Sequence, residues 1–179
     1  MTQAGSVYGE ALYTLALEEG LTDALLAELN VLQESFHQEP DFIRLLSSPN
    51  LPKQERCQVL ENSFRDKLHP YVLNFLKILT EKGYVRHFSD CVAAYTDHYN
   101  LDNGIMPVTA ITAVALTQQQ SEKLTEKLEK ITGKTVKLSN KVDSACIGGV
   151  RLDYDGKRLD DTISHRMDAI RGLLTNTVL

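Results

Sequence analysis

The first hundred residues carry apolar side chains at the three- and four-residue spacing of amphipathic helices. One stripe ends at Gly20, and the next begins at Thr22, which we expect to cap its helix. Pro40, Pro52 and Pro70 each fit the first turn of a further helix, where a missing N–H is tolerated. No strand-like alternation interrupts this half, so the pattern predicts a compact bundle of five or six short helices. The apolar stripes are Tyr8, Ala11, Leu12, Leu15 and Ala16; Leu25, Leu29, Leu32 and Phe36; Val72, Phe75, Leu76 and Leu79, ended by Gly83; and Phe88, Cys91, Val92, Tyr95 and Tyr99.

The period changes at the turn Asn103-Gly104. The β-branched segment Val108–Val114 predicts a strand, and the capping box from Thr117 to Gln120 predicts a helix that ends at Gly133. An alternating strand, a further strand, a hairpin and a final helix follow, in the order β-α-β-β-β-α. The apolar positions are Leu124, Leu128 and Ile131 on the first helix, Val136, Leu138 and Val142 on the second strand, and Ile163, Met167, Ile170 and Leu174 on the last helix.

The predicted fold class is therefore α+β, with a helical bundle over residues 1–104 and a small α/β domain over residues 105–179. Charge changes at the same place: residues 1–103 hold 8 Lys and Arg against 15 Asp and Glu, whereas residues 104–179 hold 11 against 9. No apolar run approaches the ~18–20 residues of a membrane span, and the first residues do not resemble a signal peptide. The three cysteines are far apart, so we expect them to be reduced, buried and structural. We expect a cytosolic protein that reaches a membrane only through partners.

Two adjacent glycines, Gly148 and Gly149, precede an acidic stretch and raise the question of a phosphate site. A phosphate-binding glycine loop lies between a strand and a helix, so that the helix N-terminus faces the anion. Here the glycines lead into the alternating segment VRLDY, and no Lys-Ser or Lys-Thr pair follows them. We expect local backbone shape or close packing, and not a ligand, to explain both glycines.

The acidic stretch fits a metal site no better. A calcium loop needs oxygen ligands at positions 1, 3 and 5, Gly at position 6 and an acid at position 12. With Gly156 at position 6, position 1 is Arg151 and position 12 is a threonine, so two ligands are missing. A structural interpretation accounts for the acids: Asp155 and Gly156 form a type I′ hairpin turn, and Asp160 or Asp161 caps the last helix.

No other candidate chemistry is stronger. The histidines are scattered without an H-x-x-x-H pair, and no G-x-S-x-G elbow is present. Cys91 lies near Asp90 and His87, but it fits the apolar stripe of its helix. Three lysines between residues 123 and 130 are interleaved with glutamates, which is typical of a solvated surface. The residues therefore indicate binding or scaffolding without a catalytic centre, metal or cofactor. The alternative is a helical RNA- or regulator-binding module with an α/β appendage. That module would need a basic surface, whereas the helical half of this chain is acidic.

The chain resembles the delta subunit of bacterial F-type ATP synthase, the relative of the mitochondrial oligomycin sensitivity-conferring protein. The resemblance covers nearly the whole chain, in family order and spacing. VYGEALYTLA is similar to the family's opening helix, with Gly9 in place of Ala, and LNFLKILTEKGYV is similar to its fifth helix. Arg151, Asp153 and Asp161 depart from the family pattern. The matching positions are Tyr8, Ala11 and Leu12; Asn74, Phe75, Leu76, Leu79 and Gly83; and Lys134, Val136, Val142, Asp143, Ile147, Gly148, Gly149, Val150, Asp160 and Arg166.

The resemblance implies a non-catalytic stator subunit of the F1 sector, peripheral on the cytoplasmic face of the membrane and needing no cofactor. Its N-terminal bundle of six short helices would bind the N-terminal segments of the alpha subunits, and its α/β domain would meet the C-terminal end of the b subunit. No nucleic acid is implied as a partner. In or beneath a groove between the first and fifth helices, the resemblance places Tyr8, Ala11, Leu12, Leu76, Ile78 and Leu79, of which Leu76 and Leu79 are expected to be ordinary core. The structural signature of the second domain is Gly148, Gly149, Asp155, Gly156 and Asp160.

Overall fold

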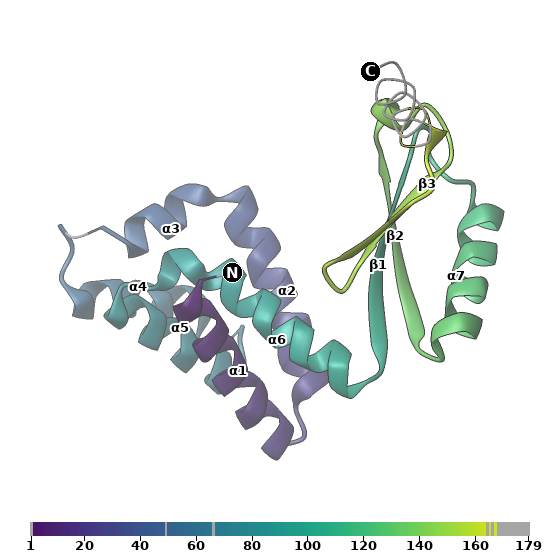
Figure 1. Ribbon diagram of the computed structural model, residues 1–179. Helices are drawn as coiled ribbons and strands as arrows, with labels where there is room; N and C mark the ends of the chain where they lie inside the picture. Colours follow the sequence, from purple (N-terminus) through teal and green to yellow (C-terminus); the bar gives the residue numbers. More distant parts are fainter. Residues whose placement is uncertain (1, 49, 66, 164, 166, 168–179) are drawn as a thin grey trace, which may run out of the picture. The chain divides into compact units, whose positions relative to one another are not determined.

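The computed structural model describes residues 2–48, 50–65, 67–163, 165 and 167. Contacts divide the chain into two compact units between Tyr99 and Asn100. The first unit is a helical bundle and the second is a small mixed sheet with a helix on it (Figure 1). The α+β fold class expected from the sequence is confirmed. Each unit is described by itself.

Six α-helices and one 3-10 turn make up the described part of the bundle (Figure 1). The apolar stripes predicted from the sequence supply its core, and Leu25, Leu76 and Tyr95 are fully buried. Aromatic rings pack edge to face in the core. The ring centroids of Phe36 and Phe88 are 5.1 Å apart, and those of Tyr13 and Tyr95 are 5.3 Å apart. The helices are α1 (Gln3–Glu18), α2 (Thr22–Gln38), α3 (Pro40–Leu46), α4 (Lys53–Phe64), α5 (Pro70–Lys82), η1 (Val85–His87) and α6 (Phe88–Asp102).

Helix α1 packs closely on α6 because two glycines of α1 face α6. A Cβ added at Gly9 would lie 2.4 Å from the carbonyl oxygen of Cys91, and one added at Gly5 would lie 2.4 Å from the Cβ of Asp90. The start of α1 is tied to the same helix, since the backbone N–H and the hydroxyl of Thr2 donate to the Asp90 carboxylate at 3.0 and 2.7 Å. These contacts fix the position of the first helix in the bundle.

The expected cap at Thr22 is wrong. Helix α1 ends in a Schellman motif, in which Gly20 has φ +66° and the N–H of Leu21 donates to the Ala16 carbonyl at 2.8 Å. That turn brings Leu21 directly to the N-cap position of α2, so Thr22 is already helical. Pro52 is likewise the N-cap of α4 and not part of its first turn, whereas Pro40 and Pro70 occupy first turns as expected.

The second unit is a four-stranded sheet in the order β2-β1-β3-β4, with α7 along one face (Figure 1). Strand β1 pairs in parallel with β2 and antiparallel with β3, and β3 pairs antiparallel with β4. Pro107 lies one residue before the β1–β3 ladder begins at Val108, so its missing N–H breaks no bond of that ladder. The elements are β1 (Ile105–Thr112), α7 (Gln118–Thr132), β2 (Thr135–Val142), η2 (Ser144–Cys146), β3 (Val150–Tyr154) and β4 (Lys157–Asp160).

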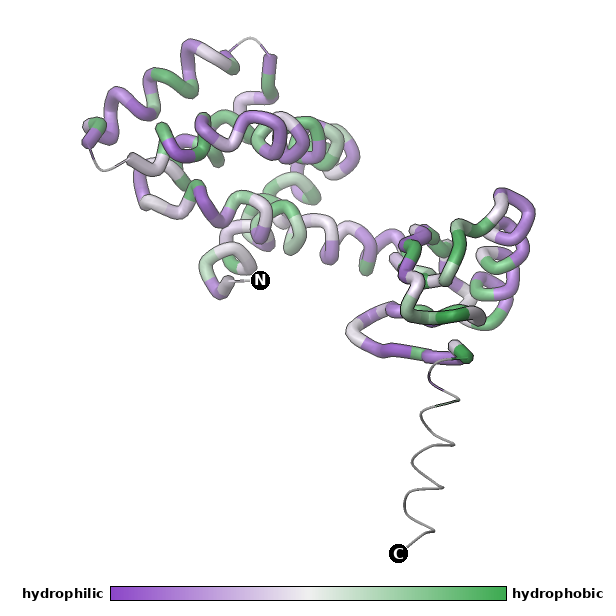
Figure 2. Tube along the Cα trace, turned by 90° about the horizontal axis from the view of Figure 1, so that it is seen from above, coloured by the Kyte–Doolittle hydropathy of each residue, from purple (hydrophilic) through white to green (hydrophobic). Residues whose placement is uncertain are grey.

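The core of this unit lies between α7 and the sheet, and Figure 2 shows hydrophobic and hydrophilic stretches alternating along α7. The capping box of Thr117 and Gln120 is confirmed, as is the left-handed Gly133 that ends the helix. The predicted apolar face of α7 is wrong at Ile131, because this side chain is 81% exposed and does not pack on the sheet. The expected last helix, with Ile170 and Leu174, lies largely outside the described residues. The core comprises Met106, Val108, Ala110, Val136 and Leu152, with Leu116, Leu124, Leu128, Leu138, Val150 and Tyr154 packed against it.

Candidate partner-binding surfaces

The predicted interface residues on α1 divide into surface and core. Leu12 is 5% exposed and belongs to the bundle core. Tyr8 is half-buried and packs its ring against Tyr84, with 5.8 Å between ring centroids. Ala11 is exposed, and so is Val7, one turn earlier on the same side of the helix. Helix α1 therefore presents a short apolar strip to solvent.

Helix α5 shows the same division. Leu76 and Leu79 are fully buried, so they can support a partner only from beneath. Ile78 is 36% exposed, and Tyr84, just beyond the left-handed Gly83 that ends the helix, is 39% exposed. The ring contact between Tyr84 and Tyr8 links the end of α5 to α1.

Together these helices offer exposed apolar side chains above a packed core. The accessible members are Val7, Tyr8, Ala11, Ile78 and Tyr84. A surface of this kind suits an amphipathic helix that lays its apolar face against the protein. Sequence reasoning missed Val7 and Tyr84; the helical spacing of Val7 with Ala11 was a usable signal, whereas Tyr84 follows a helix-ending glycine and has no periodicity to mark it.

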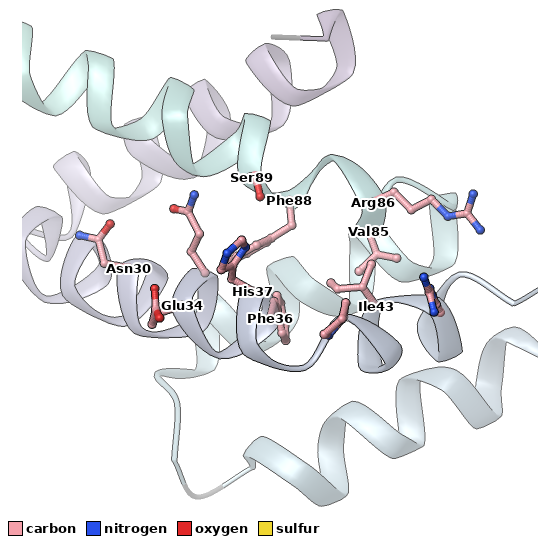
Figure 3. Close-up of a pocket in the computed structure, with 12 residues that line it drawn as sticks. Asn30, Glu34, Phe36, His37, Ile43, Val85, Arg86, Phe88 and Ser89 are labelled. Carbon is pink, nitrogen blue, oxygen red and sulfur yellow. The ribbon is translucent and has the colours of Figure 1, made fainter. Parts of the chain in front are cut away.

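A hollow of about 770 Å³ lies elsewhere on the bundle, between α2–α3 and η1–α6 (Figure 3). Its floor is the edge of the core, since Phe36 and Phe88 are at most 7% exposed. Its rim is polar and carries His37, Arg44 and Arg86. Arg44 is already paired with Asp41 at 2.9 Å. No sequence motif marked this hollow, because its floor residues belong to ordinary core stripes.

The acidic stretch of the second unit has structural partners. Asp153 accepts a hydrogen bond from the Arg158 guanidinium at 3.1 Å. Asp155 and Gly156 have φ +45° and +69°, the positive pair that a type I′ turn requires, and so the predicted hairpin turn is confirmed. Asp160 accepts hydrogen bonds from the hydroxyl and backbone N–H of Thr162, and these lower the pKa of its carboxyl. The expected helix cap at Asp160 or Asp161 is wrong, because the hydroxyl of Thr162 accepts the hydrogen bond from the N–H of His165 at 3.2 Å, three residues on.

Close packing against backbone explains the second of the adjacent glycines, Gly149. A Cβ at Gly149, which has φ +82°, would lie 2.4 Å from the carbonyl oxygen of Asp161. A Cβ at Gly148 would lie 2.9 Å from the Cδ1 of Ile163. Gly149 thus lets the segment after β4 approach the start of β3, which is a structural function, whereas the end of the Ile163 side chain could move away from a Cβ at Gly148.

The remaining chemical candidates are inert in the described structure. Burial raises the pKa of the Cys91 thiol to about 11, so it is not a thiolate at neutral pH, and the neighbouring Asp90 is held by Thr2. Cys57 is only half-buried, against expectation, while Cys91 and Cys146 are buried; all three are free thiols. Within the described residues, no group of three or more acidic, histidine or cysteine side chains could hold a metal ion, and no helix has the length and apolar character of a membrane span.

Comparison with known proteins assigns the chain to a family. Residues 5–174 match the family described as ATP synthase delta (OSCP) subunit. ATP synthase subunit delta of Alkaliphilus oremlandii is 33% identical over 172 residues, which are 96% of each chain. The subunit delta of Clostridioides difficile is 30% identical and covers 96% of this chain and 95% of its own. A chain in the cryo-EM structure of the Toxoplasma gondii mitochondrial ATP synthase hexamer has the same fold, with a TM-score of 0.75 over 98% of both chains at 17% identity.

Proposed function

The chain belongs to the ATP synthase delta (OSCP) subunit family, and on that premise we propose how its two units join the catalytic head to the peripheral stalk. Members of this family are non-catalytic stator components of the F-type ATP synthase, and the chain is one of them. The family match replaces the alternative of an RNA- or regulator-binding module. The observation that carries this assignment is the match over residues 5–174, which spans both compact units.

The helical unit binds the N-terminal segment of an alpha subunit in the groove between α1 and α5. The apolar strip of Val7, Tyr8, Ala11 and Ile78 supports this site, because a docked amphipathic helix would bury these exposed side chains. Leu12, Leu76 and Leu79 act from below, where they hold the two helices in place. The second unit meets the C-terminal end of the b subunit on the cytoplasmic side of the membrane.

This arrangement has a mechanical purpose. A joint between head and stalk prevents the head from turning with the central shaft, so that proton flow is coupled to ATP synthesis. Such a joint needs extensive apolar and polar contacts at both ends and no reactive groups. The inert Cys91 and the structurally engaged Asp153 and Asp160 are compatible with that requirement.

The alpha-binding groove is tested by introducing charge into the apolar strip. Val7→Asp and Ile78→Asp should each weaken binding of an alpha N-terminal peptide about tenfold or more, because each places a carboxylate where an apolar anchor packs. Val31→Asp is the matched control, since Val31 is a 66% exposed valine on α2, outside the proposed groove. Isothermal titration calorimetry gives the affinities, and thermal unfolding confirms the fold. Equal affinity for all three folded variants would exclude these side chains from the site.

A further inference from the structure

One carboxylate of α6, that of Asp90, lies at the start of α1. The backbone N–H and the hydroxyl of Thr2 donate to it at 3.0 and 2.7 Å. The same hydroxyl accepts a hydrogen bond from the N–H of Gly5 at 3.3 Å and so caps α1. Because the hydroxyl proton goes to Asp90 while a lone pair serves the cap, Asp90 determines how the cap residue is oriented.

Asp90 also faces the segment that carries Tyr84. His87, the last residue of η1, has its Nδ1 3.7 Å from the Asp90 carboxylate, and its ring centroid is 6.2 Å from that of Tyr84. The ring centroid of Tyr84 in turn lies 5.8 Å from that of Tyr8. The contacts therefore form a closed path, which leaves α1 at Thr2 and returns to α1 at Tyr8.

The Asp90 carboxyl is well suited to hold this path together. Hydrogen bonds from the Thr2 hydroxyl and N–H lower its pKa, and the nearby His87 acts in the same direction. The group is therefore ionised at neutral pH, and the bonds from Thr2 are charge-assisted. A Cβ added at Gly5 would lie only 2.4 Å from the Asp90 Cβ, so α1 lies directly against this side chain.

The path ends on a pair of tyrosines at the edge of the α1–α5 groove. Tyr84 is 39% exposed and Tyr8 is half-buried. Within the described residues neither phenol hydroxyl has a hydrogen-bond partner, so no hydrogen bond fixes the two rings there. Their positions depend on the backbone segments that carry them, and Asp90 contacts a neighbour of each. Aromatic rings are frequent anchors in protein interfaces, so their separation affects how a partner fits.

We propose that Asp90 is a positioning residue for the alpha-binding groove, which it supports from two sides. Through Thr2 it holds the helix that carries Tyr8. Through His87 it holds the segment that carries Tyr84. This inference rests on the proposed function, because the groove between α1 and α5 is the proposed alpha-binding site. It adds a residue of α6 to the groove.

The test measures binding of an alpha N-terminal peptide to the full chain by isothermal titration calorimetry. Asp90→Ala should weaken binding about fivefold or more, as expected for a residue in a shared network of contacts. Asp90→Asn should recover most of the affinity, because its amide oxygen can still accept the hydrogen bonds from Thr2. Asp23→Ala is the matched control and should bind like the unmodified chain, since Asp23 on α2 also accepts a hydrogen bond from α6, from the Tyr99 hydroxyl, but lies outside the groove.

Two further measurements distinguish positioning from a general loss of stability. If Asp90 acts through the tyrosine pair, Asp90→Ala should cost less affinity in a Tyr84→Ala background than in the unmodified chain. In the free chain, the nuclear Overhauser contact between the Tyr8 and Tyr84 rings should weaken in Asp90→Ala and persist in Asp23→Ala. If Asp90→Ala does not fold, Thr2→Val against Thr2→Ser makes the same comparison, because only serine keeps the hydroxyl.

The outcomes separate this inference from the proposed function. The positioning role is overturned if Asp90→Ala loses no more affinity than Asp23→Ala, if its effect adds fully to that of Tyr84→Ala, or if the ring contact is unchanged; the stator function stands in each case. If the unmodified chain does not bind the peptide, the proposed alpha-binding groove fails. The ring contact in the free chain then decides by itself whether Asp90 positions the two tyrosines.

Discussion

Replacing Gly9 by Ala tests whether close approach of α1 and α6 determines the structure of the bundle. The new Cβ would lie 2.4 Å from the Cys91 carbonyl oxygen and 2.7 Å from the Ala94 Cβ. Ordinary carbon contacts lie at about 3.5–4.0 Å, so the two helices would have to separate by roughly 1 Å. The obstacle includes backbone, and a rotamer change cannot remove it.

Two effects of opposite sign compete in this variant. Ala is favoured over Gly inside a helix by about 1 kcal/mol, which alone would stabilise the protein. Overpacking costs about 1–3 kcal/mol, and here the added Cβ would clash with two atoms of α6, the Cys91 carbonyl oxygen and the Ala94 Cβ. We expect overpacking to prevail and the free energy of unfolding to fall by about 1–2 kcal/mol. Because Tyr8 is carried on the same helix, affinity for the alpha N-terminal peptide should fall as well.

Urea unfolding followed by far-ultraviolet circular dichroism measures the effect on the helical unit. Ala11→Gly is the control, since Ala11 is exposed on the same helix and reports propensity alone, with an expected loss of about 1 kcal/mol. If Gly9→Ala is as stable as the unmodified chain, or more stable, the close approach of α1 to α6 does not require glycine and this reasoning is refuted.

Two further predictions concern single contacts. Gly149→Ala should destabilise the sheet by about 2 kcal/mol more than Gly156→Ala, because both glycines have positive φ but only Gly149 would place a Cβ against backbone. Amide hydrogen exchange of β3 measures the loss of stability in each variant, and equal losses would contradict the packing explanation. The hydrogen bonds from the Thr2 hydroxyl and N–H lower the Asp90 pKa, so their contribution to stability is complete above the ordinary carboxyl pKa of about 3.9 and is lost as pH falls through the lowered pKa. The stability advantage over Asp90→Asn should therefore shrink in acid, and an advantage independent of pH between neutrality and pH ~2 would disprove this linkage.

Local signals in the sequence predicted much of the fold. Thr117 and Gln120 form the expected capping box, and Asp155-Gly156 forms the expected hairpin turn, because both features depend only on residues a few positions apart. The apolar stripes placed Leu25 and Leu76 in the core for the same reason, since helical spacing determines the side of a helix on which a residue lies.

Features that depend on a neighbouring element were not predictable in this way. Thr22 is not a cap because the preceding helix ends in a Schellman motif that already places Leu21 there. Ile131 occupies the predicted side of α7 but is exposed, since periodicity does not say how far the packed layer extends. The contact of Tyr84 with Tyr8 joins residues distant in sequence, and only tertiary structure brings them together.

Coupled proton pumping tests the account's central claim most directly. Membrane vesicles carrying the chain's own ATP synthase would be depleted of this subunit and then reconstituted with the purified chain, with ATP hydrolysis and ATP-driven proton uptake recorded in parallel. A stator joint predicts that depletion abolishes proton uptake while the head still hydrolyses ATP, and that the added chain restores uptake. Full ATP-driven proton uptake in vesicles that lack the chain would contradict the account.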